Sequence, residues 1–292
     1  MSSERPCGVL VTDKPCGPTS QDIVRQARKF FNTKVGHTGT LDPLATGVLP
    51  LVVGRATRLA QFLQTDDKEY EAELRLGETT DTFDREGQML TKHSIPEIST
   101  QQAQSVISQF VGEIQQQPPM FSAVKVDGKK LYKLARQNRI VERPFRTVSV
   151  FSLELLKQTL ASWHIRVHCS SGTYVRALAH DIGQKLGCGA FLYNLRRIRS
   201  GSFGLNDALP VEKIENHWEE AFYSMERLLP ELPQVELDAV EASKIGHGSE
   251  ILCGDSNIEG LCRLFHKRKL IAIGEGSPPN RLRPKVVLCS SP

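Results

Sequence analysis

Long hydrophobic runs are missing from this sequence of 292 residues. No apolar segment of signal-peptide length follows Met1, and the longest apolar runs, such as residues 48–53, are far shorter than the roughly 20 residues of a membrane-spanning helix. We therefore expect a cytoplasmic protein without membrane contact. Hydrophobic residues make up 39% of the chain and charged residues 24%, a composition that suits one large globular domain and a small one.

Paired cysteines are also missing, since the seven cysteines are scattered and form no C-x-x-C motif. An odd number of isolated thiols is typical of a reduced protein without structural disulfides. The set Cys253, Cys262 and His266 matches no standard zinc-ligand spacing. The sequence therefore predicts neither a redox centre nor a metal site.

The common nucleotide-binding and hydrolase signatures are absent as well. The glycine-rich stretch GHTGTLDPLATG, residues 36–47, lacks the lysine of a Walker loop, and the chain has neither a G-x-G-x-x-G nor a G-x-S-x-G motif. The stretch does offer one carboxylate, Asp42, among glycines that let the backbone approach a substrate closely. Such a carboxylate can attack or deprotonate a substrate, although an aspartate before Pro43 also suits an ordinary turn.

Positive charge is concentrated in two segments, although the net charge is only +4. Residues 125–146 hold eight Lys or Arg against two acids, and residues 263–285 hold seven against one. The rest of the chain must then be acidic overall. Concentrated cationic surface suits a polyanion such as RNA or DNA, although a solvated charged face would show the same pattern.

Apolar periodicity predicts both helices and strands. Residues 21–31 carry an apolar stripe at helical spacing behind Thr19 or Ser20 as N-cap, whereas residues 68–77 alternate as a strand that points Tyr70 inward. The same patterns predict helices over 99–112 and 172–187 and a strand over 162–170. Because strands cluster in the middle of the chain instead of alternating with helices, we expect an α/β mixed (α+β) fold with a largely antiparallel sheet and packed helices.

A domain boundary is expected in the stretch LLPELPQVELD, residues 228–238, where two prolines follow an acidic region. We therefore divide the chain into a larger domain, residues 1–233, and a small β-rich domain, residues 234–292. The basic tail segments RLFHKRK and RLRPK would suit an accessory contact with nucleic acid.

Six motifs follow one another along the chain: LVTDKPCGPTS, GHTGTLDPLATGVLP, YEAELRLGETTDTFD, FSAVKVDGKKLYKLAR, CSSGTYVRALAHDIGQKLGCGA and LRRIRSG. Together they resemble the TruB family of tRNA pseudouridine synthases in its bacterial form, over roughly residues 8–201. The tail beyond Val235 resembles the PUA-like C-terminal domain of that family more weakly. The resemblance implies the pseudouridine synthase fold and isomerisation of uridine 55 in the T loop of tRNA. It also implies base flipping, no cofactor or metal, and a monomer whose partner is tRNA.

The resemblance also assigns a catalytic set. Asp42 matches the catalytic aspartate, and Tyr70 the tyrosine that stacks on the isomerising base, although an alternating strand also suits a core aromatic. Arg196 matches the arginine expected to pair with Asp42 and lower its pKa, with Arg197 as the adjacent candidate. Asn194 stands where some relatives carry a tyrosine.

RNA-binding residues are implied in the same way. His37 matches a histidine that inserts into the T loop, and Lys14 with Pro15 matches a motif that buttresses the catalytic loop. A thumb-like insertion around residues 124–147 would close over the RNA. The candidate contacts in this insertion are Lys125, Lys129, Lys130, Lys133 and Arg136. Tyr174 and Arg176 are further candidates at the wall of the site, although both also suit a structural role. The alternative function is a non-catalytic RNA-binding or tRNA-folding module, which would require no catalytic set.

Overall fold

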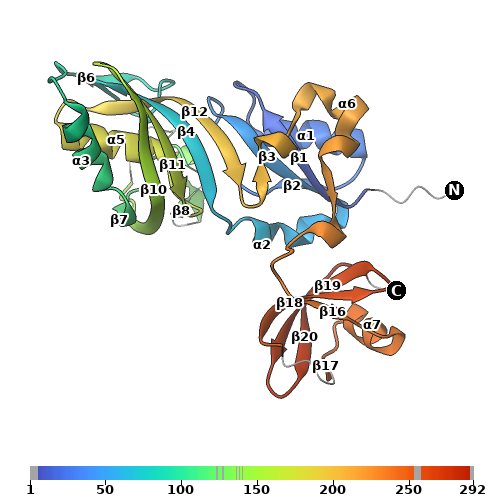
Figure 1. The fold of residues 1–292 in the computed structure, drawn as a ribbon. Coiled ribbons are helices and arrows are strands. Elements are labelled where there is room, and N and C mark those ends of the chain that lie inside the picture. The colour runs from blue at the N-terminus through green and yellow to red at the C-terminus, as the bar shows by residue number, and fades with distance from the viewer. Residues whose placement is uncertain are drawn as a thin grey trace.

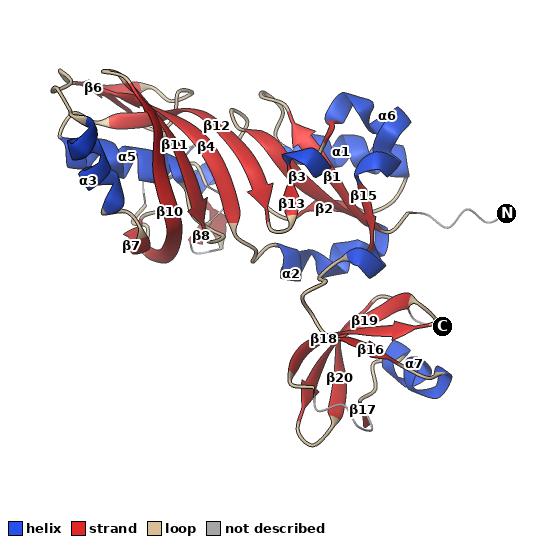
Figure 2. Cartoon of the chain, viewed as in Figure 1, coloured by secondary structure: helices blue, strands red, loops and turns tan. Residues whose placement is uncertain are grey.

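A computed structural model describes residues 6–289 of the chain, apart from residues 123, 127, 136, 138, 140 and 253–257. It contains a large twisted sheet of 11 strands with helices packed against it, and a smaller sheet of five strands in the C-terminal part (Figures 1 and 2). None of the helices within these ranges has the length and apolarity needed to span a membrane.

The large sheet runs in the order β14-β1-β3-β12-β4-β11-β10-β7, with β15, β2 and β13 paired alongside β1, β3 and β12. Neighbouring strands are antiparallel except for β1 with β14 and β12 with β3. The expected α+β fold with a largely antiparallel sheet is therefore confirmed. The strands are β1 (Gly8–Lys14), β2 (Val35–His37), β3 (Thr46–Val53), β4 (Lys68–Leu76), β7 (Gly112–Gln116), β10 (Arg146–Gln158), β11 (Ser162–Cys169), β12 (Ala190–Ser200), β13 (Phe203–Gly204), β14 (Leu209–Pro210) and β15 (Phe222–Ser224).

The parallel junction of β12 and β3 adjoins the loop that carries Asp42. Residues 38–45 connect β2 to β3, and Arg197 of β12 is in register with Gly47 on one side and with Tyr70 on the other. Gly47 has φ of +103°, and a Cβ there would lie 2.2 Å from the carbonyl oxygen of Arg197. Only glycine permits this approach, which brings the Asp42 loop, β12 and β4 side by side.

Three helices pack against the large sheet, and the starts of two of them and the end of the third carry the capping residues that the sequence predicts. Helix α1 (Ser20–Phe31) begins behind Thr19 with a capping box, and α3 (Thr100–Ser108) does the same behind Ser99. Helix α5 (Val175–Leu186) ends at Gly187, which has the expected left-handed conformation. Helix α3 is shorter than predicted, since it ends at Ser108 and the chain turns over the next three residues before β7 begins at Gly112.

Shorter elements connect these parts. Strands β5 (Glu78–Thr80) and β6 (Met89–Lys92) form one small ribbon, and β8 (Lys125–Val126) and β9 (Lys129–Lys130) form another. The short helices are α2 (Ala60–Leu63), α4 (Leu131–Ala135) and α6 (Ile214–His217), and the 3₁₀ turns are η1 (Gly54–Leu59), η2 (Leu205–Asp207), η3 (Val211–Lys213), η4 (Trp218–Ala221) and η5 (Met225–Arg227).

The C-terminal part is a sheet in the order β16-β18-β19-β20-β17, covered by α7 (Ala239–Gly246). Its strands are β16 (Gln234–Glu236), β17 (Ile251–Leu252), β18 (Gly260–His266), β19 (Lys269–Ser277) and β20 (Arg281–Val287). Apolar side chains of this sheet, including Phe265 and Leu270, share a buried cluster with Val9 and Val52 of the large sheet. The expected small β-rich part is thus present, and an apolar contact joins it to the larger body.

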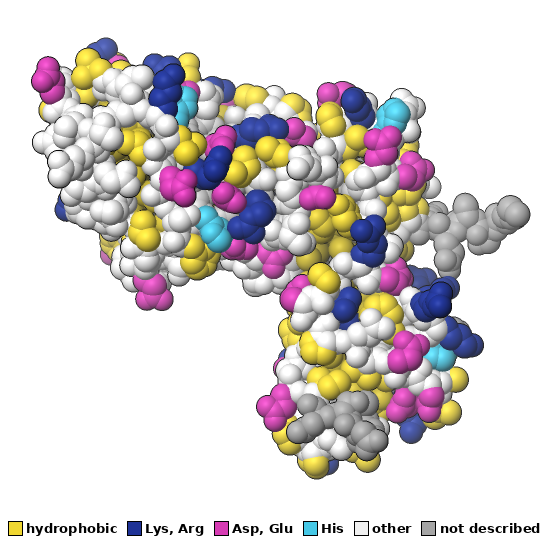
Figure 3. Space-filling model, viewed as in Figure 1, with side chains coloured by type: hydrophobic (Ala, Val, Ile, Leu, Met, Phe, Trp, Pro, Cys, Tyr) yellow, Lys and Arg dark blue, Asp and Glu magenta, His cyan; other side chains and the backbone are white. Residues whose placement is uncertain are grey.

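The two faces of the central strands differ in chemistry. On β4 the inward residues are buried, whereas the alternate outward residues pair with neighbouring strands, as Glu71 does with Arg166 and Glu69 with Arg199. Figure 3 shows acidic and basic side chains interleaved on the visible face of the large sheet. Because these pairs are partly exposed, they contribute solubility and strand register more than stability.

Helix α5 contains one carboxyl group whose burial should lower stability. Burial raises the pKa of Asp181 from 3.8 to about 6. The folded state therefore binds more protons than the unfolded state between these values, so stability falls as the pH rises through that window. We predict that Asp181→Asn raises the free energy of unfolding at pH 7.5 by about 1–2 kcal/mol and changes it little at pH 4.

Urea unfolding at the two pH values measures this difference. The exposed Glu97→Gln serves as the control and should show no such pH dependence. An equal effect of Asp181→Asn at pH 4 and pH 7.5 would contradict the prediction.

Candidate active site

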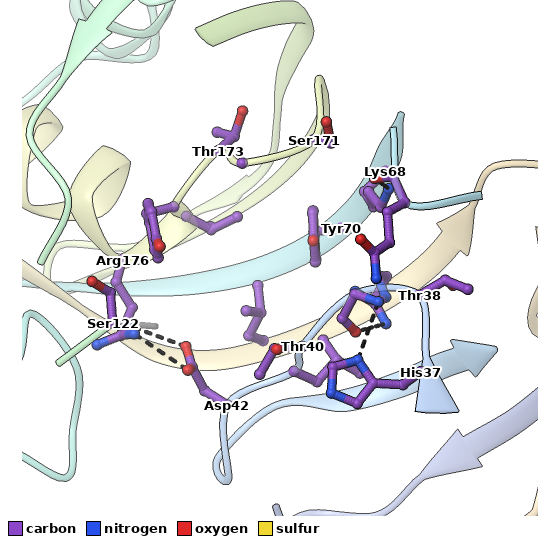
Figure 4. A pocket seen from close by; sticks show the side chains of 18 residues that line it. His37, Thr38, Thr40, Asp42, Lys68, Tyr70, Ser122, Ser171, Thr173 and Arg176 are labelled. Carbon is purple, nitrogen blue, oxygen red and sulfur yellow. Dashed lines mark hydrogen bonds and ion pairs between the residues drawn. The ribbon is translucent and has the colours of Figure 1, made fainter. Parts of the chain in front are cut away.

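A cavity of about 380 Å³ opens on the inner side of the large sheet. The end of β2 supplies His37, the loop after it Asp42, β4 Tyr70, β12 Arg197, and the start of α5 Arg176 (Figure 4). Segments far apart in the sequence therefore meet at one hollow, where a carboxylate, a phenol and two guanidinium groups lie close together.

Asp42 faces Arg176 across this cavity. The Nε atom of Arg176 lies 2.9 Å from Oδ2 of Asp42, and Nη2 donates to Oδ1 at 3.2 Å. The Asp42 side chain is 33% exposed, whereas that of Arg176 is only 4% exposed. The guanidinium thus fixes the carboxylate from the protein side and leaves part of it open to a ligand.

Arg176 is itself held by three further groups. It donates to the carbonyl oxygens of Phe121 at 2.9 Å and Thr82 at 3.2 Å, and its Nη1 lies 3.5 Å from Oδ2 of Asp84. Burial raises the pKa of Asp84, while hydrogen bonds from Thr82 and the charge of Arg176 oppose that rise. One arginine therefore joins two carboxylates, one facing the cavity and one buried behind it.

The loop that carries Asp42 is held from below by Lys14. Its fully buried ammonium donates to the carbonyl oxygens of Ala45 at 2.7 Å, Pro15 at 2.8 Å and Pro43 at 3.3 Å. Burial lowers the pKa of Lys14 to about 8. This geometry matches the expected buttress, whereas the prediction that Lys14 contacts RNA is wrong because its side chain is sealed beneath the loop.

Tyr70 forms the wall opposite the Asp42 loop and is only 8% exposed. Burial raises the pKa of Tyr70, while the nearby charge of Arg197 opposes that rise, so its hydroxyl is a neutral phenol at pH 7. Arg197 also donates to the carbonyl oxygens of Val48 at 2.7 Å and Gly39 at 3.1 Å. Arg197, which is in register with Tyr70 on β4, therefore holds the loop that carries Asp42 beside that strand.

The predicted pairing of Arg196 with Asp42 is wrong. Arg196 instead forms a two-pronged ion pair with Asp13, at 2.7 and 3.2 Å, and donates to Thr46 at 3.3 Å. The reason is strand parity, since successive side chains of β12 point to opposite faces, and Arg197 shares the inner face with Tyr70.

The outer face of the same strands holds a second hollow of about 300 Å³. Arg196 lines it together with Asn194, whose side chain donates to Glu73 at 2.7 Å and accepts from Arg85. Asn194, which stands where some relatives carry a tyrosine, therefore belongs to this outer network and not to the cavity with Asp42.

His37 and Tyr174 line the cavity as predicted candidates. Burial, assisted by the charge of Arg197, lowers the pKa of His37, so its ring is neutral at pH 7. Tyr174 is positioned through its backbone, because the amide of the buried Gln116 accepts from its N–H at 2.8 Å and donates to its carbonyl at 3.0 Å. The sequence pattern did not predict this role of Gln116, because a glutamine on an edge strand is normally expected to be exposed.

The thumb-like insertion contains the β8-β9 ribbon and α4. Lys129 and Lys133 are exposed, while Leu131 and Leu134 form a small apolar cluster against which Tyr174 packs. The side chains of Lys125 and Lys130 lie outside what the structure describes, as does the whole of Arg136. The insertion thus adjoins the cavity wall and presents lysines to solvent.

Known protein families and individual relatives match the sequence of this chain. Residues 27–175 match the TruB family pseudouridylate synthase N-terminal domain, residues 176–236 the tRNA pseudouridylate synthase B C-terminal domain, and residues 233–288 the pseudouridine synthase II TruB C-terminal model. The chain belongs to the TruB family. Proteins named tRNA pseudouridine synthase B from Dechloromonas aromatica (strain RCB) and Solibacter usitatus (strain Ellin6076) are 45% and 42% identical to it. The alignments cover 95% and 96% of this chain and 94% and 99% of those proteins.

Solved structures agree with this TruB assignment. The chain resembles a chain of a Cbf5-Nop10-Gar1 complex, with a TM-score of 0.73, 28% identity, and coverage of 96% of this chain and 84% of that chain. A chain of an H/ACA RNP bound to a substrate RNA containing 2'-deoxyuridine gives the same TM-score and coverage at 26% identity. The pseudouridine synthase fold expected from the motifs is therefore confirmed.

The two arginines give a direct test of the observed pairing. Arg176→Met should lower the free energy of unfolding by about 3 kcal/mol or more, because it leaves the buried Asp84 without its cation. Arg196→Met should cost at most about 1 kcal/mol, because its pair with Asp13 is partly exposed. Urea unfolding of both variants measures the contrast, and equal losses would count against the arrangement described here.

Proposed function

We propose that this chain converts uridine 55 in the T loop of tRNA to pseudouridine. The observation that carries the proposal is the Asp42 carboxylate, held by the buried Arg176 guanidinium and left open to a cavity walled by Tyr70. The names of the TruB relatives support tRNA as the substrate class.

The reaction starts with the target uridine leaving its stack in the T loop, because the Asp42 carboxylate cannot reach a sugar inside a folded RNA loop. Asp42 then either attacks C1′ of the ribose or removes the 2′ proton, and in both routes the bond from C1′ to N1 of uracil breaks. The released uracil turns and its C5 bonds to C1′. In the first route this step breaks the bond from Asp42 to C1′, and in the second the 2′ proton returns to C2′. The proton on C5 is then lost, while N1 gains one. All atoms and the oxidation level are conserved, so no external oxidant, reductant or group donor is required.

Each neighbour of Asp42 has a role in this scheme. Arg176 keeps the carboxylate oriented toward the sugar. Tyr70 offers a neutral ring for the uracil to stack on while it turns. The neutral His37, at the edge of the cavity, would take the space that the uridine leaves in the T loop.

Two basic regions would hold the rest of the tRNA. The insertion at residues 124–147 presents Lys129 and Lys133 beside the cavity. A groove of about 570 Å³ between η1, α2 and β20 is lined by Lys34, Arg58 and Lys285. Phosphate contacts in both regions would orient the RNA, while its shape and the flipped base would give selectivity.

This scheme assigns one task to each part of the chain. Residues 1–233 would perform catalysis, and residues 234–292 would act as a PUA-like RNA-binding domain. A monomer suffices, because every residue of the proposed site comes from one chain. Since tRNA is the substrate, we expect the protein to act in the cytoplasm.

A non-catalytic RNA-binding or tRNA-folding module is the alternative function. It would need the cationic surfaces but not a carboxylate held by a buried arginine next to a phenol. The ion pair of Asp42 with Arg176 therefore favours the enzyme, because burying that arginine is costly unless it serves a defined geometry.

The catalytic role predicts a separation of binding from chemistry. Asp42→Asn preserves the shape of the side chain and removes its charge. We expect the Kd for an unmodified tRNA transcript to change by no more than about threefold, while the rate of pseudouridine formation falls by at least roughly a thousandfold. Filter binding and chemical mapping of pseudouridine measure the two quantities, and appreciable turnover by Asp42→Asn would remove Asp42 from its assigned role.

The role of the insertion predicts a change in salt dependence. Reversing the charge of Lys129 and Lys133 to Glu should weaken tRNA binding and lower the slope of log Kd against log salt by roughly 1–2, since each lost phosphate contact removes nearly one unit. The matched control reverses Lys185 and Lys213, which are exposed on other elements. Equal slopes for the two double variants would show that the insertion does not contact phosphates.

A further inference from the structure

An aromatic stack lies one helical turn beyond Arg176. The ring of His180 on α5 lies against the ring of Phe83, with centroids 4.0 Å apart and planes 19° from parallel. His180 follows Arg176 by four residues, so both side chains lie on the same side of α5. Neither Phe83 nor His180 lines the cavity that contains Asp42.

Phe83 has a backbone conformation that needs support. Its φ is +63°, the left-handed region that a bulky side chain rarely adopts. Its N–H donates to the carbonyl of Thr80 at 3.2 Å, its own carbonyl accepts from the N–H of Leu192 at 2.9 Å, and the N–H of Arg85 donates to the carbonyl of Leu192 at 3.0 Å. The turn is thus held against β12 on one side and against α5 through the stacked rings on the other.

The residues on either side of Phe83 are two of the four partners of Arg176. The carbonyl of Thr82 accepts from Arg176 at 3.2 Å, and Oδ2 of Asp84 lies 3.5 Å from the same guanidinium nitrogen. Thr82 also donates its hydroxyl to Asp84 at 2.6 Å. A shift of the Phe83 ring would therefore move these two partners of Arg176 and, through Arg176, the Asp42 carboxylate.

The imidazole of His180 has no visible acid or base task. Its Nδ1 is buried and has no hydrogen-bond partner among the residues that the structure describes. Burial lowers the pKa of His180, so the ring is neutral at pH 7. What the histidine contributes is therefore a flat surface for Phe83.

We propose that Phe83 and His180 form a positioning pair that sets the turn holding Arg176, and through it the orientation of Asp42. This inference rests on the proposed function, because the quantity it controls is the rate of pseudouridine formation. The stack acts on the chemical step and leaves tRNA binding alone, since neither ring faces the cavity.

The test is a double-mutant cycle on the full chain with His180→Ala, Phe83→Leu and the double variant. The single-turnover rate at saturating tRNA should fall roughly 3- to 10-fold in each single variant, the range expected for loss of an aromatic pair. The double variant should be no slower than the slower single variant, because one loss already breaks the stack. His180→Phe should restore the rate, and the Kd for tRNA should stay within about twofold throughout.

Phe203→Leu is the matched control, because it breaks the edge-to-face pair with Tyr223, whose centroids are 5.2 Å apart, outside the cavity. It should leave the rate unchanged. A wild-type rate in His180→Ala, full additivity in the double variant, or a change in Kd without a change in rate would overturn the proposal. Should His180→Ala fail to fold, as judged by thermal unfolding, Phe83→Leu and His180→Phe still give the rate comparison.

Measuring Asp42→Asn in the same series tests the proposed function of the site separately from the positioning pair. If Asp42→Asn is inactive and His180→Ala is normal, only the positioning pair is wrong. If Asp42→Asn remains active, the proposed function of the site fails first, whatever the stack does.

Discussion

The organisation of the site depends on one buried cation, the guanidinium of Arg176. A buried arginine is stable only when its charge is compensated, and here two carboxylates and two carbonyl oxygens, from Asp42, Asp84, Phe121 and Thr82, surround the guanidinium. These partners come from three separate parts of the chain. Compensating one side chain therefore draws the Asp42 loop, the turn at residues 82–86 and the segment just before the insertion toward the start of α5.

The rest of the fold makes this convergence possible. The parallel contact of β12 with β3 places the Asp42 loop beside Tyr70, and Lys14 and Arg197 hold that loop through its carbonyl oxygens. Both side chains are almost fully buried, so they shape the loop from inside the protein. The outer face of the same strands carries partly exposed ion pairs, which tolerate water and leave the inner face free for the cavity.

Sequence reasoning succeeded where the pattern is local. Alternation placed Tyr70 on the inner face of β4, and capping signals located the starts of α1 and α3. It failed for the arginine that pairs with Asp42. The motif with adjacent arginines does not say which strand face each occupies, and Arg196 lies on the outer face, away from Asp42. Arg176 lies on a helix that reads as core packing, and its contact with Asp42 spans 134 residues, so only the tertiary fold brings the two together. Lys14 was misjudged for a similar reason, since burial of a lysine cannot be read from a turn motif.

The most direct measurement of the central claim is a structure of this chain with an RNA hairpin that carries the T loop. The account predicts that the target nucleotide lies flipped into the inner cavity, with its base on the Tyr70 ring and its sugar against the Asp42 carboxylate, while Arg176 keeps its contact with that carboxylate. A complex in which the nucleotide occupies the outer hollow beside Arg196 and Asp13, or stays stacked in the loop away from Asp42, would contradict the account.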